Sequence, residues 1–364
     1  MGGCTTGWRP TSRTTVRTGF AKRGWCVPAR PRRAARREGR AVRARLVAEL
    51  ARGVRDGRGL AHKRDIAPVM ARLGLAGTPV AGVRVGDDCA AIPDGDGWLL
   101  FAIESFLDDF TAAMPWFAGW CGVMVNLSDI AAMGGRAIAV VDALCARDGG
   151  HAAPMLDGLA AASRVYGVPL VGGHTNTREH AEHLSVAVLG RARRLLSSFA
   201  ARPGEVLVAA IDLRGAFHDP HPFWDASTRG ASPERLRGDL AVLPGLAEAG
   251  LCRAAKDISN AGLLGTALML AECSGIGLSV SLDAIPRPEG VDLARWVAAF
   301  PSYGFLLAAR EPELPAVLAS FAARGIAAAA VGRCEAGTRL ELVDGSEREV
   351  VWDLADSPLM GVAA

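Results

Sequence analysis

The ten residues 126–135, Asn-Leu-Ser-Asp-Ile-Ala-Ala-Met-Gly-Gly, decide how this chain is interpreted. Their apolar members recur at helical spacing and two glycines follow, so the pattern predicts a helix that packs on a core and stops at Gly134-Gly135. Asp129 is the exception. A carboxylate among apolar residues is costly to bury unless it is hydrogen-bonded, paired or bound to a cation. A capping or turn interaction would also explain it, and the residue alone does not separate these readings.

Other polar residues stand in similar apolar surroundings, far from Asp129 along the chain. They are Gly86-Asp87-Asp88, Glu104, Gly172-Gly173-His174-Thr175 and Asp257. Oxygen ligands of this kind suit Mg²⁺, which takes one or two carboxylates together with substrate phosphates and water. The Gly172-Gly173 pair would let backbone amides approach a phosphate, with Thr175 and Asn176 as further donors. Each feature alone has a plainer explanation, a simple turn or a solvated Asp pair, and only their joint occurrence favours a site.

The chain has 364 residues, half of them hydrophobic and few of them aromatic. This length suffices for two domains, and the composition is typical of an α/β protein packed with Ala, Val and Leu. Residues 1–45 hold twelve arginines and Lys22 against one acid, Glu38, so the net charge of this tail is about +12. Because the net charge of the whole chain is +3, residues 46–364 carry about −9. We expect this tail to be disordered and assign it no function. We predict neither a nucleic-acid nor a membrane partner.

Eight cysteines are scattered through the chain without a CxxC pair. That spacing indicates a reduced, cytoplasmic protein rather than a disulfide framework or a zinc ribbon. No run reaches the roughly 18 apolar residues that a membrane span needs.

The order of expected elements divides the chain into two parts. Residues 46–192 predict β-β-α-β-α-β, an α+β half whose small sheet is covered on one face. Residues 203–346 predict a second α/β domain, with an irregular segment at 215–232 that is a candidate lid or a mobile loop. The expected strands are 80–85, 98–103, 137–144, 169–171, 183–190, 206–211, 278–282, 304–309, 327–331 and 340–343, and the expected helices are 42–55, 66–73, 116–132, 153–166, 233–249, 263–273 and 313–324.

The common signatures of nucleotide and hydrolase sites are missing. The sequence has no GxxxxGK[ST], no GxGxxG that opens a helix, no GxSxG and no HExxH, which disfavours P-loop, dinucleotide, α/β-hydrolase and zincin chemistry. His180 and His183 lack a third ligand at suitable spacing, so an exposed turn explains them better than a metal pair does.

Several motifs together resemble the superfamily of aminoimidazole ribonucleotide (AIR) synthase, over about residues 45–345. Gly86-Asp-Asp-Cys-Ala-Ala91 is similar to its GDDAA segment, and residues 126–134 are close to the NLSDLAAMG of thiamine-phosphate kinase, an enzyme of thiamine biosynthesis. Three further segments resemble conserved segments of the superfamily. Residues 172–175 resemble its GGDT/GGHT segment, Pro203-Gly204-Glu205 its PGD segment, and residues 256–263 its DxTxGGL segment.

The resemblance implies a two-domain fold in which the N-terminal halves of a homodimer join their sheets into a β-barrel, with ATP at the interface. It implies that several Mg²⁺ ions bridge the phosphates. The implied metal ligands are Asp87, Asp88, Glu104, Asp129 and Asp257; the implied nucleotide contacts are Asn126, Gly172, Gly173, His174 and Thr175; the expected catalytic residues are Lys63, as a mobile charge over the site, and Asp257.

The chain departs from each branch of the superfamily at a diagnostic position. Asn260 replaces the second Asp of the kinase motif, and residues 301–308 are closer to the selenophosphate and hydrogenase-maturation branches. Those branches carry a reactive Cys shortly before their Lys, whereas Gly59-Leu-Ala-His-Lys63 has no thiol. We therefore expect an ATP- and Mg²⁺-dependent enzyme that phosphorylates a small molecule. The alternatives are a ligase or selenophosphate synthetase-like enzyme and a non-catalytic nucleotide-binding subunit of a complex.

Overall fold

In the computed structural model, residues 1–2, 32–75, 79–80, 82–106 and 108–362 are described, and residues 40–364 form one compact unit. Most of the predicted tail lies outside the described residues. Helix α1 (Arg32–Arg55) nevertheless begins ten residues before the expected start at Val42, so residues 32–45 are not the disordered segment that we predicted. Its Ala, Arg and Glu residues are good helix formers, which explains the extension. In the described part of the chain, no helix is both long and apolar enough to cross a membrane.

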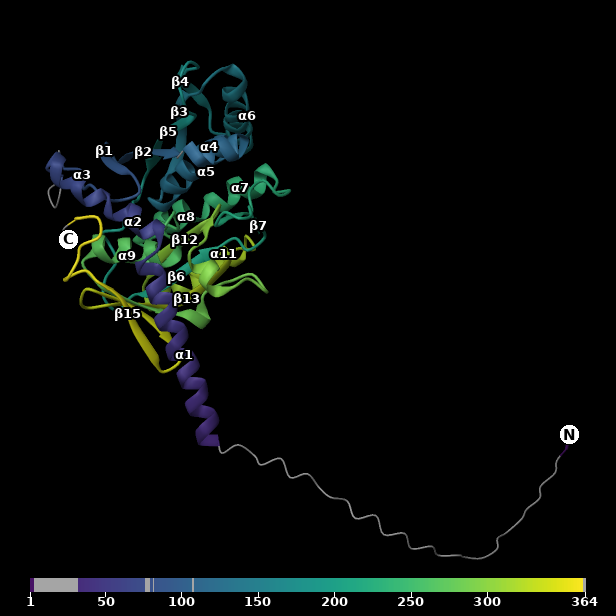
Figure 1. Cartoon of the computed structure of the whole chain (residues 1–364), viewed down its shortest axis with the longest axis vertical. Helices are drawn as coiled ribbons and strands as arrows, with labels where there is room; N and C mark the ends of the chain where they lie inside the picture. The colour runs from purple at the N-terminus through teal and green to yellow at the C-terminus, as the bar shows by residue number, and fades with distance from the viewer. Residues whose placement is uncertain (3–31, 76–78, 81, 107, 363–364) are drawn as a thin grey trace, which may run out of the picture. The chain divides into compact units, whose positions relative to one another are not determined.

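The first half is built on a five-stranded sheet in the order β1-β2-β5-β3-β4. The strands are β1 (Ala90–Asp94), β2 (Gly97–Phe106), β3 (Arg136–Cys145), β4 (Leu170–Asn176) and β5 (His183–Ala192). All neighbours are antiparallel except β3 and β4, which helix α6 (Gly149–Tyr166) connects as a parallel pair. Helices α5 (Pro115–Ala132) and α6 cover one face of this sheet (Figure 1), with the short α4 (Asp108–Ala113) before them.

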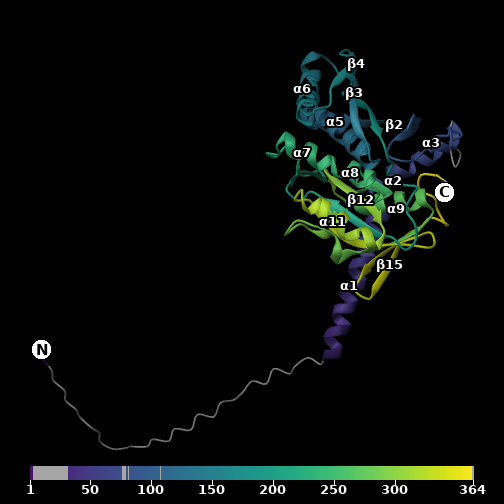
Figure 2. The same cartoon turned by 180° about the vertical axis from the view of Figure 1, so that it is seen from behind.

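Helix α5 is the central element of the fold, and it lies where the sequence predicted it. Pro115 occupies its first turn, where a missing N–H costs nothing, and every residue from Phe117 to Ala132 is buried. The helix ends as expected: Gly134 takes a left-handed φ of 74°, and the Gly135 N–H donates to the Ile130 carbonyl at 2.9 Å. A helix that is apolar on all sides must be covered on all sides. Figure 1 shows α5 between the five-stranded sheet and the second half, and Figure 2 shows the same arrangement from behind.

The second half is a seven-stranded sheet in the order β15-β14-β10-β13-β6-β12-β9. Its strands are β6 (Val206–Ile211), β9 (Ala254–Asp257), β10 (Gly277–Ser281), β12 (Gly304–Ala309), β13 (Ala327–Glu335), β14 (Arg339–Asp344) and β15 (Glu347–Asp353). Alternate residues of β6 enter two separate cores, so both faces of this sheet are covered. The core on one face contains α9 (Gly262–Ser274), α10 (Leu293–Val297), α2 (Arg58–Arg64) and α3 (Ile66–Leu73); the core on the other contains α8 (Val242–Glu248) and α11 (Leu314–Ala322).

Several expected elements differ from those in the structure. The expected strand 80–85 is reduced to an isolated bridge between Val80 and Val83. The expected helix 233–249 is divided at Ala241 into α7 (Pro233–Leu240) and α8. Strands β9 and β15 were not predicted, because β9 is short and carries Lys256-Asp257, and β15 is rich in charged residues.

Segment 215–232 is an ordered part of the second half rather than the irregular lid or mobile loop that we predicted. It contains β7 (Ala216–Phe217) and β8 (Phe223–Asp225), which form a small sheet with β11 (Phe300–Pro301). The buried Asp225 carboxylate binds the segment together, because Oδ1 accepts hydrogen bonds from the Ser227 N–H at 2.8 Å and the Thr228 N–H at 3.1 Å.

Gly119 on α5 and Gly158 on α6 allow the two helices to cross closely, because a Cβ at Gly119 would overlap the Met155 carbonyl oxygen. A Cβ at Gly158 would overlap the Trp116 carbonyl oxygen and lie 2.9 Å from the Trp120 nitrogen. We predict that Gly158→Ala lowers the free energy of unfolding by about 1–3 kcal/mol through overpacking, measured by urea denaturation.

The matched control is Gly245→Ala in α8, where an added Cβ meets nothing within 4 Å. That substitution is expected to stabilise the chain by about 0.5–1 kcal/mol through helix propensity. A Gly158→Ala variant as stable as the parent protein would contradict the close crossing.

Candidate functional site

Three carboxylates from three distant parts of the chain meet within the fold. They are Asp88, in the loop before β1, Asp129, in the last turn of α5, and Asp257, at the end of β9. One oxygen from each lies within 4.8 Å of the others. Asp129 and Asp257 are buried, and the Asp88 side chain is 3% exposed. The structure therefore brings together three of the five predicted metal ligands.

Two oxygens in this group have no partner. Asp88 Oδ2 and Asp129 Oδ2 are both buried and accept no hydrogen bond within the described residues. Leaving a buried acceptor unpaired costs about 1–3 kcal/mol, and more when the group is charged. An oxygen-only donor set with unpaired carboxylates fits a hard divalent cation such as Mg²⁺. The residues present are thus suited to the predicted metal.

Without a bound metal ion, the three carboxylic acids resist losing their protons together. Burial raises the pKa of Asp129 well above its ordinary value, and the nearby charges of Asp257, Glu104 and Asp88 raise it further. Burial likewise raises the pKa of Asp88, although the Lys256 ammonium opposes the shift. The pKa of Asp257 is raised by burial against the opposing charges of Lys256 and Lys63. A cation bound here would relieve the cost of holding these groups ionised.

Lys256 is a member of the site that the sequence analysis did not identify. Its ammonium forms an ion pair with Asp88 Oδ1, and the two side chains are only 6% and 3% exposed. Burial acts to lower the pKa of Lys256, but the carboxylates of Asp88 and Asp87 outweigh it and raise the pKa. The sequence does contain a signal for this role: Lys256 stands in a short segment, Ala254 to Ile258, that begins and ends with apolar residues. A lysine buried in such a segment requires an anionic partner for its ammonium.

Asp87 lies beside the group of three but outside it. Its Oδ2 accepts a hydrogen bond from the Ser197 hydroxyl at 2.7 Å, and both of its oxygens lie 3.1 Å from the Ser198 N–H. The side chain is therefore held by the segment that links the two halves, and it anchors the loop that presents Asp88. Its predicted role as a metal ligand stays a prediction.

Glu104 and Lys63 face the same site from other elements. Glu104 lies inside β2 rather than at its end, and its side chain is exposed in the single chain; the pKa of its carboxyl is raised by the protein atoms packed around it, against the charge of Lys63. Lys63 is on α2 and half-buried, not in a mobile loop. A Cβ at Gly59 would overlap the Asn260 carbonyl, so α2 is docked directly on the loop that follows Asp257.

The predicted nucleotide contacts of residues 172–175 lie on a strand far from the one that carries Glu104. Gly172, Gly173, His174 and Thr175 are exposed residues of β4, so the predicted glycine turn is in fact a strand. Strand β4 is three positions from β2 in the sheet, about 14 Å at roughly 4.8 Å per strand. A Cβ at Gly173 would overlap Asp142 Oδ1, so packing within the sheet accounts for this glycine.

Asn126 is fully buried in α5. Its side-chain amide donates to the carbonyl oxygens of Gly122, at 2.8 Å, and Val186, at 3.0 Å, and so fastens α5 to β5. The structure therefore assigns it a packing role, and its predicted contact with a nucleotide stays a prediction.

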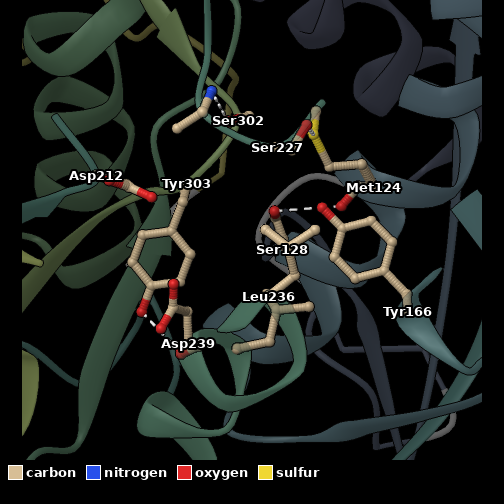
Figure 3. A pocket seen from close by; sticks show the side chains of 11 residues that line it. Met124, Ser128, Tyr166, Asp212, Ser227, Leu236, Asp239, Ser302 and Tyr303 are labelled. Atoms are coloured by element: carbon tan, nitrogen blue, oxygen red, sulfur yellow. Dashed lines mark hydrogen bonds between the residues drawn. The ribbon is translucent and has the colours of Figure 1, made fainter. Parts of the chain in front are cut away.

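Two cavities flank α5 on sides other than the carboxylate group. One cavity is lined by residues that include Ser128, Tyr166, Asp239 and Tyr303 (Figure 3). Its volume of about 10 Å³ leaves room for about one water molecule. A more open cavity of about 260 Å³ lies against Leu127 and neighbouring residues of α5 and α8. The lining of neither contains a member of the carboxylate group.

Comparison with known proteins gives the family. Residues 86–192 match the N-terminal domain of AIR synthase related proteins, and residues 210–345 match the C-terminal domain. The chain belongs to the AIR synthase related family. Its two-domain α/β fold is the fold of that family, as the sequence motifs indicated. A single chain contains an open five-stranded sheet, not a closed barrel.

Relatives in the AIR synthase related family include proteins of different activities. The chain is 45% identical over 307 residues to a protein of Synechocystis described as uncharacterized, covering 83% of this chain and 94% of the relative. It is 31% identical over 228 residues to a thiamine-monophosphate kinase of Methanopyrus kandleri, covering 59% and 71%.

Solved structures show the same fold at lower identity. Thermotoga maritima PurL complexed with ATP superposes with a TM-score of 0.66 at 20% identity, covering 82% of this chain and 49% of PurL. AaThiL complexed with AMPPCP and TMP gives a TM-score of 0.59 at 18% identity, covering 78% and 94%.

The raised pKa of Asp129 predicts the pH dependence of the metal-free protein. The unfolded chain loses this proton near pH 4, whereas the folded chain retains it to higher pH. Stability should therefore fall as pH rises from about 4 through the folded pKa. We expect Asp129→Asn to flatten this fall, and to raise the free energy of unfolding at pH 8 in chelator by about 1–3 kcal/mol.

Asp353→Asn is the control, because folding lowers the pKa of Asp353 whereas it raises that of Asp129. The free energy of unfolding of both variants is measured by urea denaturation at a series of pH values. Hydrogen bonds from Arg339 and Thr338 lower the pKa of Asp353 to about 2. It contributes stability above pH 4 that is lost as pH falls through about 2, so its removal should destabilise the neutral protein. A destabilised Asp129→Asn protein at pH 8 in chelator would show that the ionised carboxylate is well solvated or paired.

Proposed function

We propose that the chain binds ATP together with Mg²⁺ at the group of three carboxylates and transfers the terminal phosphoryl group to a small molecule. The observation that carries this proposal is the pair of buried, unpartnered oxygens, Asp88 Oδ2 and Asp129 Oδ2. Similarity to thiamine-monophosphate kinases and to structures complexed with ATP or AMPPCP supports a nucleotide as the ligand.

The residues of this chain would divide the work as follows. Asp88, Asp129 and Asp257 would hold Mg²⁺, which when bound neutralises charge on the phosphates. Lys63 extends a positive charge from α2 toward Glu104 and Asp257, where it can attract and orient an anionic phosphate. Because these carboxylates sit on α5, β9 and an anchored loop, they need little reorganisation when the substrate arrives.

A non-catalytic nucleotide-binding subunit is the second candidate. Asn260, an exposed residue in the loop after Asp257, stands where the kinase motif has a second Asp. Without that carboxylate the site has one anionic ligand fewer for a metal ion that would neutralise a reacting phosphoryl group. A ligase or selenophosphate synthetase-like reaction remains an alternative within enzymes, and similarity to a selenide, water dikinase of Geobacter metallireducens, 31% identical over 227 residues, supports it.

We further propose that the chain forms a homodimer through the open face of the five-stranded sheet. Large apolar side chains are exposed there, in contrast to the face covered by α5 and α6. They are Ile92, Phe101, Ile103, Ile138, Val141, Val171 and Leu189. A contiguous apolar surface of this kind is typical of a protein interface. A second sheet packed on it would close a barrel and would bring the partner's β4 toward this site.

A reducing, cytoplasmic location belongs to the same proposal. The six cysteines among the described residues are all free thiols, and five of them are buried. Such thiols are typical of proteins that work where disulfides do not persist.

Nucleotide binding predicts a metal-dependent gain in thermal stability. A non-hydrolysable ATP analogue with Mg²⁺ at about a hundred times its dissociation constant should stabilise the native protein by about 2.7 kcal/mol, a shift of several degrees. Asp129→Asn should lose this shift because it removes a ligand oxygen, and Asp353→Asn should keep it.

Release of ADP then separates the two candidate functions. The pure protein is tested with ATP, Mg²⁺ and a panel of acceptors that begins with thiamine phosphate. If ATP binds and no acceptor yields ADP, the binding-subunit proposal replaces the kinase proposal. If no analogue binds to the parent protein, both are refuted.

The homodimer predicts that a charge on the open face of the sheet separates the copies. Phe101 is 51% exposed, and Phe101→Glu would place a carboxylate in a dry interface. We expect the molar mass from light scattering to fall by half. Leu156→Glu on α6, where the side chain is 38% exposed on the opposite side of the sheet, should leave the mass unchanged. A parent protein of monomeric mass would refute the proposal.

A further inference from the structure

Lys256 places a fixed positive charge inside a site proposed to hold divalent cations. The residue lies on β9, directly before Asp257, and its ammonium binds Asp88 Oδ1 with both side chains almost fully buried. The neighbouring charges that act on it are those of Asp88, Asp87 and Asp257, together with the Cys273 thiol. No other lysine or arginine of the described residues is paired with a carboxylate of this group.

The ion pair divides the oxygens of Asp88 between two roles. Oδ1 is neutralised by Lys256, whereas Oδ2 is buried and has no hydrogen-bond partner among the residues that the structure describes. Asp88, Asp129 and Asp257 each offer one oxygen to the compact group within 4.8 Å, and of the two Asp88 oxygens Oδ2 is the one that Lys256 leaves free for a metal. A second divalent ion on the Oδ1 side would have to displace a buried ammonium from its partner.

We propose that Lys256 acts as a built-in monovalent cation, so that the carboxylate group holds one divalent ion in the absence of nucleotide instead of a pair. This inference rests on the proposed metal site. It goes further, because it assigns Lys256 the position of a second ion and predicts a stoichiometry. Two like charges in a poorly hydrated site repel strongly, so the ammonium also weakens the binding of the ion that remains.

The arrangement differs from a simple structural ion pair in a way that can be measured. A structural pair would leave metal binding unchanged when its lysine is replaced, apart from any loss of folded protein. Replacing a built-in cation instead leaves the carboxylates without a compensating positive charge, which an added divalent ion should supply. Methionine matches the length and apolar stem of lysine without its charge, and arginine retains the charge.

The experiment counts Mn²⁺, used as a spectroscopic substitute for Mg²⁺, by electron paramagnetic resonance titration of the full chain without nucleotide. The parent protein should bind one Mn²⁺ that Asp129→Asn abolishes. Lys256→Met should bind a second Mn²⁺, or bind the first about tenfold more tightly. Lys256→Arg should resemble the parent protein. In chelator, Lys256→Met should unfold at a lower temperature than the parent protein. When Mn²⁺ replaces the chelator, the unfolding temperature of Lys256→Met should rise by more than that of the parent protein.

Three results would overturn the inference, and the last of them needs no variant. A parent protein that binds two Mn²⁺ ions, both lost in Asp129→Asn, would show that Lys256 does not take the place of an ion. A folded Lys256→Met protein with the stoichiometry and affinity of the parent would show that the pair is only structural. A parent protein that binds no Mn²⁺ at all would instead refute the proposed metal site, and the inference with it.

Discussion

The fold is organised around the burial of Asp129 in a helix that is apolar on every side. A carboxylate at that position is tolerated only if something compensates its charge, and the described part of the chain supplies no hydrogen bond to its Oδ2. The structure instead brings Asp88 and Asp257 to the same place, which adds negative charge. Concentrating buried carboxylates lowers stability unless a cation binds, so the arrangement is understandable as a binding site and not as a stabilising feature.

Helix α9 explains how the loop that presents Asp88 is kept in place. Three consecutive residues at its end each hold a different part of the site. The Cys273 thiol donates to the Gly86 carbonyl oxygen at 3.5 Å, and the Ser274 hydroxyl donates to the Ser198 carbonyl oxygen at 2.5 Å. The Ser198 N–H in turn donates to Asp87. The end of α9 thus helps to attach the loop of Asp87 and Asp88 to the seven-stranded half.

Glu272, the third of these residues, ties down the end of the chain. Its carboxylate accepts backbone N–H groups from Leu359 at 2.9 Å, Met360 at 2.7 Å and Gly361 at 3.1 Å. Beyond them, the buried Val362 lies where a Cβ on Gly86 would stand, and Gly86 has a φ of 116° that favours glycine. The loop of Asp87 and Asp88 is therefore held from both sides, which keeps its carboxylates in position.

The sequence predicted most of the core and part of the site, and the reasons for success and failure are physical. Elements with long apolar runs, such as α5, β6 and β12, were placed nearly at their true bounds, because burial on all sides leaves a continuous signal. Asp88, Asp129 and Asp257 were grouped as polar residues in apolar surroundings, and the family resemblance implied their role as metal ligands; that their side chains converge is visible only in the structure. Lys256 was missed because its partner is 168 residues away in sequence.

The Gly172-Gly173 pair is an example of a feature that the sequence alone did not predict correctly. Gly172-Gly173 was taken for a phosphate-binding turn, but the strand continues through it and Gly173 makes room for Asp142. Every residue from Leu170 to Thr175 is exposed in the single chain, on a strand at the edge of a sheet whose open face is apolar. An edge strand with unpaired backbone groups and apolar side chains is unfavourable in water unless another surface covers it. If these residues contact phosphate, the arrangement favours a contact across an interface, because β4 lies three strands from β2, the strand that carries Glu104.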